Sequence, residues 1–211
     1  MRWFGGIKKL TAVDGYNLWA PTYYQETNPI KSMSDDFVVE TLPALVGKSV
    51  LDAGCGAGKF CAYALERGAA LVQGIDLSPA MIEEAKRNCA GASFECIDLS
   101  TASLETFDVV ICGLVLGHIE DHIAVIDKLT NALKKDGTIV ITDFHPYQSK
   151  LKAKRTFKDK LSGKTFEIKH IGHPIDDYLM AFKKNGISRT AFVEPRFNGN
   201  PVIFGIAGVK S

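Results

Sequence analysis

Three glycines alternate within residues 52–58, which read DAGCGAG. The apolar pair Val50 and Leu51 precedes them, and the helix-favouring run 60–65 follows. This order is typical of a strand, a tight turn and a helix. Such a turn directs backbone N–H groups and the positive end of the helix dipole above the strand. We therefore expect this stretch to bind the carboxylate or phosphate of a nucleotide-like ligand.

Two common glycine loops fit this stretch poorly. A P-loop requires Gly-Lys followed by Ser or Thr, but Phe60 follows Gly58 and Lys59, and Ala53 stands where the first glycine belongs. A dinucleotide fingerprint starting at Gly54 requires a third glycine at position 59, where the chain has Lys59. The P-loop interpretation therefore fails, and the dinucleotide fingerprint is matched only in part.

A second acidic residue strengthens the nucleoside interpretation. Residues 69–76 read AALVQGID, the pattern of a buried parallel strand that ends in Asp76. A carboxylate at this strand end can accept both ribose hydroxyls, in NAD enzymes as in others. Ser78 and Pro79 follow as an N-cap and a first helical residue. Together, Asp52 and Asp76 predict a nucleoside ligand, but they do not identify the nucleoside.

The combined motifs identify the chain as similar to class I S-adenosylmethionine-dependent methyltransferases. Residues 50–58 resemble motif I of that family, and residues 74–81 (GIDLSPAM) resemble the following G-x-D-x-S-x-x-M motif. Residues 93–99 resemble its third strand, and 107–118 its motif IV region. The resemblance is strongest over 48–143 and is closest to the small-molecule, ubiquinone-biosynthesis-like branch (methyltransferase type 11/25).

The resemblance implies that S-adenosylmethionine is the cofactor and assigns a set of residues to it. Asp52 would meet the methionine ammonium, Asp76 the ribose, and Asp98 with Leu99 the adenine. The tyrosines of residues 16–24, which resemble a Y-D-x-x-A-x-x-Y-D stretch, would approach the methionine end, with Asn17 and Tyr24 in place of the usual acids. The implied cofactor residues are Tyr16, Tyr23, Asp52, Gly54, Cys55, Gly56, Asp76, Leu77, Met81, Asp98, Leu99, Cys112, Gly113 and Leu114.

Candidate catalytic bases are the histidines placed beyond strand ends, because ligands of such sheets bind outside the carboxyl ends of the strands. His118 follows the fourth expected strand and His145 the fifth, and imidazole suits proton removal near neutral pH. Both could instead shape their loops. We expect Trp19, Tyr24, Tyr147 and His173 on the substrate side, although the aromatic residues near the N-terminus could equally be a packing face.

Alternating strand and helix patterns position these residues. We expect strands near 48–53, 70–75, 92–97, 107–112 and 137–142, and helices near 59–67, 79–89 and 121–134. A further helix near 174–184 precedes strands at 187–194 and 202–209. The expected fold is α/β, a Rossmann-like doubly wound sheet of seven strands, mostly parallel with an antiparallel last strand.

A single domain is expected over 1–211. Its parts are an N-terminal helical lid (1–46), a cofactor-binding core (47–143), an inserted substrate-side segment (144–173), and the last helix with the final strand pair (174–211). Within the insert, residues 150–169 hold eight Lys or Arg against Asp159 and Glu167. They predict a basic hairpin, which either attracts an anionic ligand or is simply a solvated edge.

Composition limits the partners. A net charge of +1 over 211 residues argues against a general nucleic-acid surface, and the most apolar run, 109–119, is too short to cross a bilayer. Five cysteines without a C-x-x-C pair predict neither disulfides nor zinc. We expect a cytoplasmic enzyme, monomeric or homodimeric, with a small-molecule substrate, no metal, no nucleic acid and no membrane insertion. O- or N-methylation fits best; an NAD-dependent oxidoreductase and a non-catalytic S-adenosylmethionine-binding protein remain alternatives.

Overall fold

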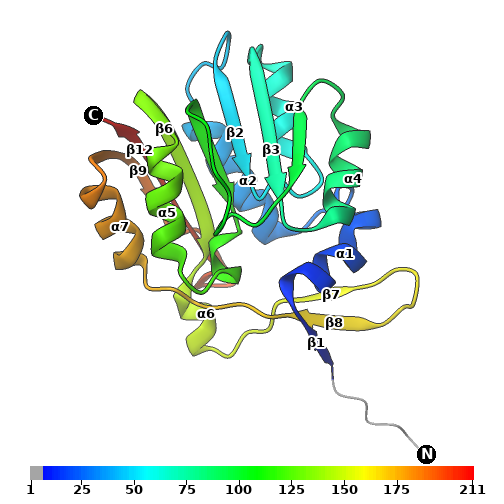
Figure 1. Ribbon diagram of the computed structural model, residues 1–211. Coiled ribbons are helices and arrows are strands. Elements are labelled where there is room, and N and C mark those ends of the chain that lie inside the picture. Colours follow the sequence, from blue (N-terminus) through cyan, green and yellow to red (C-terminus); the bar gives the residue numbers. More distant parts are fainter. Residues whose placement is uncertain (1–6) are drawn as a thin grey trace, which may run out of the picture.

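A seven-stranded sheet organises the computed structural model, which describes residues 7–211 (Figure 1). The strand order is β4-β3-β2-β5-β6-β12-β9, and only β12 runs antiparallel to its neighbours. This confirms the doubly wound α/β fold with an antiparallel last strand. The strands, in sheet order, are Ser93–Cys96, Leu71–Asp76, Ser49–Ala53, Phe107–Gly113, Leu133–Phe144, Ile203–Lys210 and Ile187–Val193.

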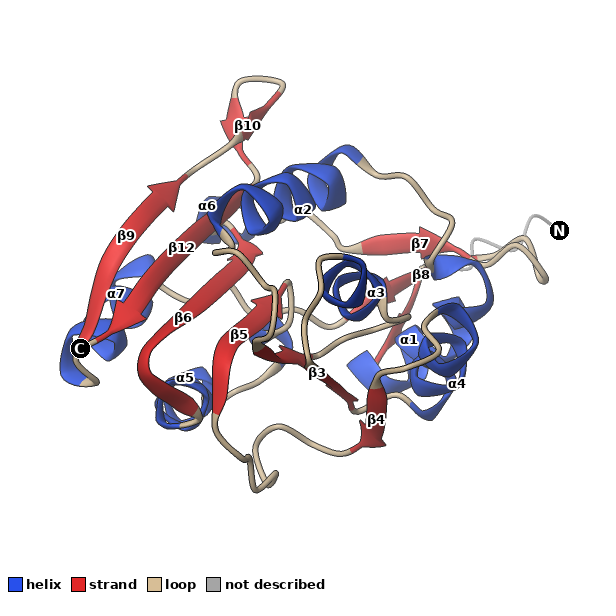
Figure 2. Ribbon diagram, turned by 90° about the horizontal axis from the view of Figure 1, so that it is seen from above, coloured by secondary structure: helices blue, strands red, loops and turns tan. Residues whose placement is uncertain are grey.

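Helices cover both faces of the sheet, as the views from the side and from above show (Figures 1 and 2). Helices α5 (His122–Asn131) and α7 (Ile175–Lys184) pack on one face, and α2 (Pro29–Thr41) and α3 (Lys59–Glu66) lie on the other. The core is correspondingly split into two apolar clusters, with Leu51 in one and Val50 in the other. Successive strand residues therefore face opposite layers, as expected for a sheet buried on both sides.

Helix α4 (Pro79–Asn88) begins as the sequence predicts. Ser78 is its N-cap, and the Ser78 hydroxyl accepts a hydrogen bond from the Met81 amide at 3.1 Å. Pro79 occupies the first turn, where a missing N–H costs nothing. The cap fixes the point at which the chain turns from the end of β3 into α4, directly beside Asp76.

The predicted end of helix α5 (His122–Asn131) is wrong. The helix expected over 121–134 stops at Asn131, and β6 already begins at Leu133. Leu133 is buried and pairs with Phe107 of β5, so burial of this side chain outweighs the helix-ending signal at residues 134–137. Asp136 then takes a positive φ of 61°, and the chain resumes pairing with β5 at Thr138.

A smaller three-stranded sheet lies below the carboxyl ends of the main strands in Figure 1. Its hairpin, β7 (Thr156–Lys158) and β8 (Thr165–Ile168), confirms the hairpin predicted in the basic segment. Strand β1 (Lys8–Leu10) pairs parallel to β8, which the sequence did not predict. Helix α1 (Ala12–Tyr23) follows β1, and α6 (Pro146–Lys150) follows β6.

Only part of the expected N-terminal lid covers the strand ends. Helix α1 packs against α4 and β8, whereas α2 packs against β5, β6 and β12 as part of the core. The remaining short elements are η1 (Leu116–His118), β10 (Arg196–Phe197) and β11 (Asn200–Pro201). Within residues 7–211, no helix combines the length and apolar character needed to span a bilayer, and no cluster of His, Cys, Asp or Glu could hold a metal ion.

Candidate functional site

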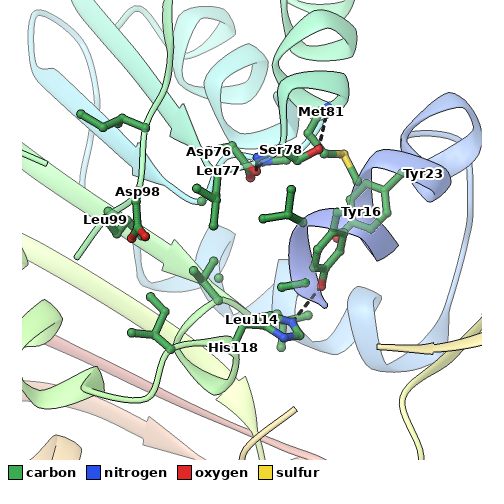
Figure 3. A pocket seen from close by; sticks show the side chains of 18 residues that line it. Tyr16, Tyr23, Asp76, Leu77, Ser78, Met81, Asp98, Leu99, Leu114 and His118 are labelled. Atoms are coloured by element: carbon green, nitrogen blue, oxygen red, sulfur yellow. Dashed lines mark hydrogen bonds between the residues drawn. The ribbon is translucent and has the colours of Figure 1, made fainter. Parts of the chain in front are cut away.

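A pocket of about 720 Å³ opens between the carboxyl ends of the parallel strands and helix α1 (Figure 3). We call it the Asp76 pocket. It gathers the following predicted cofactor residues: Tyr16, Tyr23, Gly54, Gly56, Asp76, Leu77, Met81, Asp98, Leu99, Gly113 and Leu114. Cys112 is fully buried and is not among the residues that line it.

Two carboxylates lie on the wall of the Asp76 pocket (Figure 3). Asp76 accepts hydrogen bonds from the Gly56 amide at 2.9 Å and the Ser78 amide at 2.8 Å, one on each oxygen. Asp98 accepts the Ser100 amide at 2.8 Å on a single oxygen. A carboxylate offers about four acceptor positions, so both groups retain lone pairs for ligand hydroxyl or amino groups.

Three amides of the glycine loop are already hydrogen-bonded within the protein. The amides of Gly54 and Cys55 donate to the Ile75 carbonyl at 2.7 and 2.9 Å, and Gly56 donates to Asp76. These three amides are therefore not free to bind an anion. Gly54 is instead required for space, because a Cβ there would lie 2.2 Å from Val115 in a backbone conformation with φ of 80°. The glycine loop therefore places backbone atoms without side chains on the wall of the Asp76 pocket.

Asp52 lines an adjoining pocket of about 490 Å³, which we call the Asp52 pocket. Its carboxylate is 1% exposed and accepts a hydrogen bond from the Cys61 thiol at 3.6 Å. Burial, only partly offset by that thiol, raises the pKa of Asp52 to about 7. No cation of residues 7–211 pairs with this carboxylate. Cys55 and Tyr24, both predicted at the site, line this pocket too.

A third pocket lies between α1, the start of α2 and the residues 154–156 that lead into β7, and we call it the Arg155 pocket. It is lined by Trp19, Tyr23, Glu26, Asn28, Ile30, Lys31, Leu114, Phe144, Lys154, Arg155 and Thr156. Tyr23 and Leu114 line all three pockets. Leu114 has a positive φ of 59°, a strained conformation for a residue with a side chain, and such strain is concentrated at functional sites.

A chain of hydrogen bonds connects the Arg155 pocket to His118. The Arg155 guanidinium donates to the Tyr16 hydroxyl at 2.6 Å, and this hydroxyl lies 3.1 Å from His118 Nε2. His118 Nδ1 lies 2.9 Å from the Lys169 carbonyl, which can only accept. The ring is therefore protonated on Nδ1, and Nε2 accepts the Tyr16 proton. Burial and the positive charge of Arg155 lower the pKa of His118 to about 3.

Three predicted residues, His145, Tyr147 and His173, do not line these pockets, whereas Trp19 and Tyr24 do. His145 caps α6 by accepting the Tyr147 amide at 3.0 Å, and its Nε2 donates to Glu194 at 2.7 Å. Both ring nitrogens are thus hydrogen-bonded to neighbouring groups, just beyond the carboxyl end of β6. Tyr147 is exposed on α6. His173 is buried against His122, with ring centroids 3.6 Å apart, and bonds the Ile119 carbonyl.

Sequence reasoning did not single out several residues that line the pockets. Lys31, Asp35 and Arg155 come from segments that carry no recognised motif. Arg155 belongs to the basic run 150–169, whose charge was the available signal. Lys31 had no comparable signal, because its position depends on how α2 packs on the sheet.

Comparison with known proteins adds an independent result. The profile of the methyltransferase domain family matches residues 45–185 of this chain, which covers the strands that build the pockets. A ubiquinone biosynthesis O-methyltransferase of Neisseria meningitidis serogroup C is 39% identical over 103 residues, covering 45% of this chain and 43% of that protein. The chain therefore spans less than half the length of this curated relative.

Solved structures share the fold along most of the chain. A structure from Listeria monocytogenes, described as a putative S-adenosylmethionine dependent methyltransferase, superposes with a TM-score of 0.73 at 24% identity. The match covers 85% of this chain and 99% of that one. Magnesium protoporphyrin IX methyltransferase of Synechocystis PCC 6803, with bound SAH, gives 0.68 at 23% identity, covering 94% of each chain.

Proposed function

This chain belongs to the methyltransferase domain family, as a class I S-adenosylmethionine-dependent methyltransferase, and we propose that it methylates a small-molecule acceptor. The observation that carries the proposal is a pair of acids on adjacent strands, Asp52 buried and Asp76 partly buried. Asp52 lies in β2 and Asp76 ends β3, and each lines one of two pockets that share the glycine loop between them.

The residues present fit S-adenosylmethionine. The Asp52 carboxylate is buried without a cationic partner among residues 7–211, which suits a ligand ammonium group. Asp76 has free lone pairs for ribose hydroxyls, and Asp98 has an oxygen for the adenine amino group. Met81 is 1% exposed and lines the same pocket, so it can pack against the base. An ammonium, a ribose and an adenine thus each find a matching group.

When bound, the cofactor would supply a sulfonium methyl group, whose carbon a nucleophile attacks in line while the C–S bond breaks and the sulfur leaves with the electron pair. The protein then has to orient the nucleophile and exclude water. Tyr23 and Leu114, at the junction of the three pockets, are placed to do both. Tyr23 is packed edge-on against Tyr16 and Trp19, with ring centroids 5.9 and 5.1 Å apart, so its position is fixed.

His118 contributes little as a general base in this proposal. Its pKa of about 3 keeps it neutral at physiological pH, but a base this weak gives proton removal little driving force. Its Nε2 is already occupied by the Tyr16 hydroxyl. We therefore assign His118 to positioning Tyr16, and most of the acceleration to alignment of the nucleophile with the methyl group.

The acceptor is a small molecule, and O-methylation has the most support. That support is the name of the relatives, ubiquinone biosynthesis O-methyltransferase, together with the Arg155 pocket of about 770 Å³ beside the cofactor pockets.

A labelled-donor screen tests this proposal. The protein is incubated with methyl-labelled S-adenosylmethionine and separate panels of phenols, carboxylates, amines and thiols. We expect label transfer to members of one oxygen-acceptor panel, and at least tenfold less transfer by Asp76→Asn, which weakens the ribose contacts. Transfer to amines or thiols alone would contradict O-methylation, and transfer to none of the four classes would contradict a small-molecule acceptor.

A further inference from the structure

Two cationic side chains line the Arg155 pocket without a carboxylate partner. Arg155 Nη2 donates to the Tyr16 hydroxyl, while Arg155 Nη1 is buried and has no hydrogen-bond partner. Lys31 Nζ donates to the Tyr23 carbonyl at 3.1 Å, and an ammonium group has two further protons to donate. Among residues 7–211, no carboxylate lies within ion-pair distance of Arg155 or Lys31.

The acids nearby are already satisfied by other groups. Asp35 pairs with Lys59. Glu26, which lines the same pocket, accepts the Trp19 indole N–H at 2.8 Å and the Thr22 hydroxyl at 3.1 Å. A third cation of the pocket, Lys154, pairs with Glu167 at 3.2 Å. The unpaired positive charge of the pocket is therefore concentrated on Arg155 and Lys31.

Both cations are held in place by aromatic rings. The Arg155 guanidinium lies 4.0 Å from the Phe144 ring centroid, and Lys31 Nζ lies 3.9 Å from that of Tyr23. Burial lowers the pKa of Lys31, consistent with an ammonium that has lost part of its hydration. A partly desolvated, fixed cation with unused donors binds an anion strongly, because the cost of ordering it has already been met in the free protein.

The rest of the pocket is largely apolar. Trp19 stacks on Phe157 with ring centroids 4.7 Å apart. Ile30, Leu114 and Phe144 also line the pocket. This combination selects a ligand with a flat or apolar body and one anionic group. Because Leu114 and Tyr23 also line the Asp52 and Asp76 pockets, such a ligand would point its other end toward the cofactor.

We infer that the methyl acceptor carries a carboxylate or phosphate group, which Arg155 and Lys31 bind while Trp19 and Phe144 hold its apolar body. This inference rests on the proposed function, because it assigns the Arg155 pocket to the acceptor. The anionic group anchors the molecule, and its nucleophile lies at the junction formed by Tyr23 and Leu114.

A matched pair of probes tests the anion site. Benzoate and benzamide share size and shape and differ in charge, and their binding to the protein saturated with S-adenosylhomocysteine is measured by isothermal titration calorimetry. We expect benzoate to bind about tenfold more tightly than benzamide. The preference should disappear in Arg155→Gln and fall in Lys31→Gln. Phenyl phosphate, as a third probe, shows whether the site prefers phosphate to carboxylate.

Lys158→Gln is the matched control, because Lys158 lies on the same hairpin and is exposed. It should keep the wild-type preference. Binding of S-adenosylhomocysteine by each variant reports that the fold is intact. Equal affinities for benzoate and benzamide in the wild type, no benzoate binding, or an undiminished preference in Arg155→Gln would overturn the inference. Failure to bind S-adenosylhomocysteine would instead contradict the proposed function, and the probe pair can still be measured without it.

Discussion

Asp52 is a residue whose ionised form is unfavourable in the free protein but favourable when a ligand cation is bound. Its carboxylate is buried beside the Cys61 thiol, and its pKa is raised to about 7. Ionising it without a partner is unfavourable, whereas ionising it against a ligand cation is favourable. The charge of the free protein at this position therefore depends on pH across the neutral range.

The resulting prediction concerns the affinity for S-adenosylhomocysteine, whose ammonium requires an ionised Asp52. Below the raised pKa, the free protein carries a proton that must be lost on binding, so affinity should fall as the pH falls. We expect about a tenfold loss per pH unit from pH 7 to 5, measured by calorimetry. Asp52→Asn should bind weakly at pH 8 with a flat profile. If the affinity of the wild type and that of Asp52→Asn depended on pH in the same way, this role of Asp52 would be refuted.

Much of the lining of the Asp76 pocket could be predicted from the sequence because its contacts are local. Asp76 is two residues from the Ser78 amide it binds and lies at the end of its own strand. Arg155 is different, because its partner Tyr16 is 139 residues away in the sequence. His145 was misplaced for a related reason: its position beyond β6 was correct, but its side chain turns to cap α6 and to bind Glu194.

At the scale of elements, α1 forms one wall of the site. Asn17 attaches it to the start of α4, where its Oδ1 accepts the Ser78 hydroxyl at 2.7 Å and the Ala80 amide at 3.3 Å. The related sequence pattern has an acid at this position, and either side chain supplies the acceptor that a helix N-terminus favours. This contact holds Tyr16 and Tyr23 over the pockets.

Replacing Asn17 therefore tests the attachment of α1. Asn17→Ala removes two hydrogen bonds, worth about 1–2 kcal/mol together, so S-adenosylhomocysteine should bind several-fold more weakly and α1 should be cleaved faster in limited proteolysis. Asn17→Asp should retain both properties. Asn131→Ala, at the exposed end of α5, is the control. The attachment would be disproved if Asn17→Ala and Asn131→Ala behaved alike.

Most helices and strands followed from local patterns, and the exceptions have tertiary causes. The start of α5 was predicted within a residue, but its end was not, because Leu133 pairs with β5 instead of continuing the helix. His122, in the first turn of α5, is 6% exposed because it packs against His173 and Tyr178. Strand β1 exists only because β8, more than 150 residues later, offers it an edge.

At the scale of the whole molecule, the fold separates two tasks. The parallel strands place Asp52, Asp76 and Asp98 along one edge of the sheet, while α1 and the β7–β8 hairpin lie across that edge, below it in Figure 1. The first arrangement follows from strand order and could be read from the sequence. The second depends on packing between distant segments, which is why the Arg155 pocket emerged only from the structure.

The most direct test of the account is a calorimetric comparison of S-adenosylhomocysteine with NAD. If Asp52, Asp76 and Asp98 form one site for S-adenosylmethionine, the wild type binds S-adenosylhomocysteine with one-to-one stoichiometry. NAD should then bind at least a hundredfold more weakly, and Asp76→Asn should lose most of the S-adenosylhomocysteine affinity, as expected when two ribose hydroxyls lose a charged acceptor. Tight binding of NAD with no response to S-adenosylhomocysteine would contradict it.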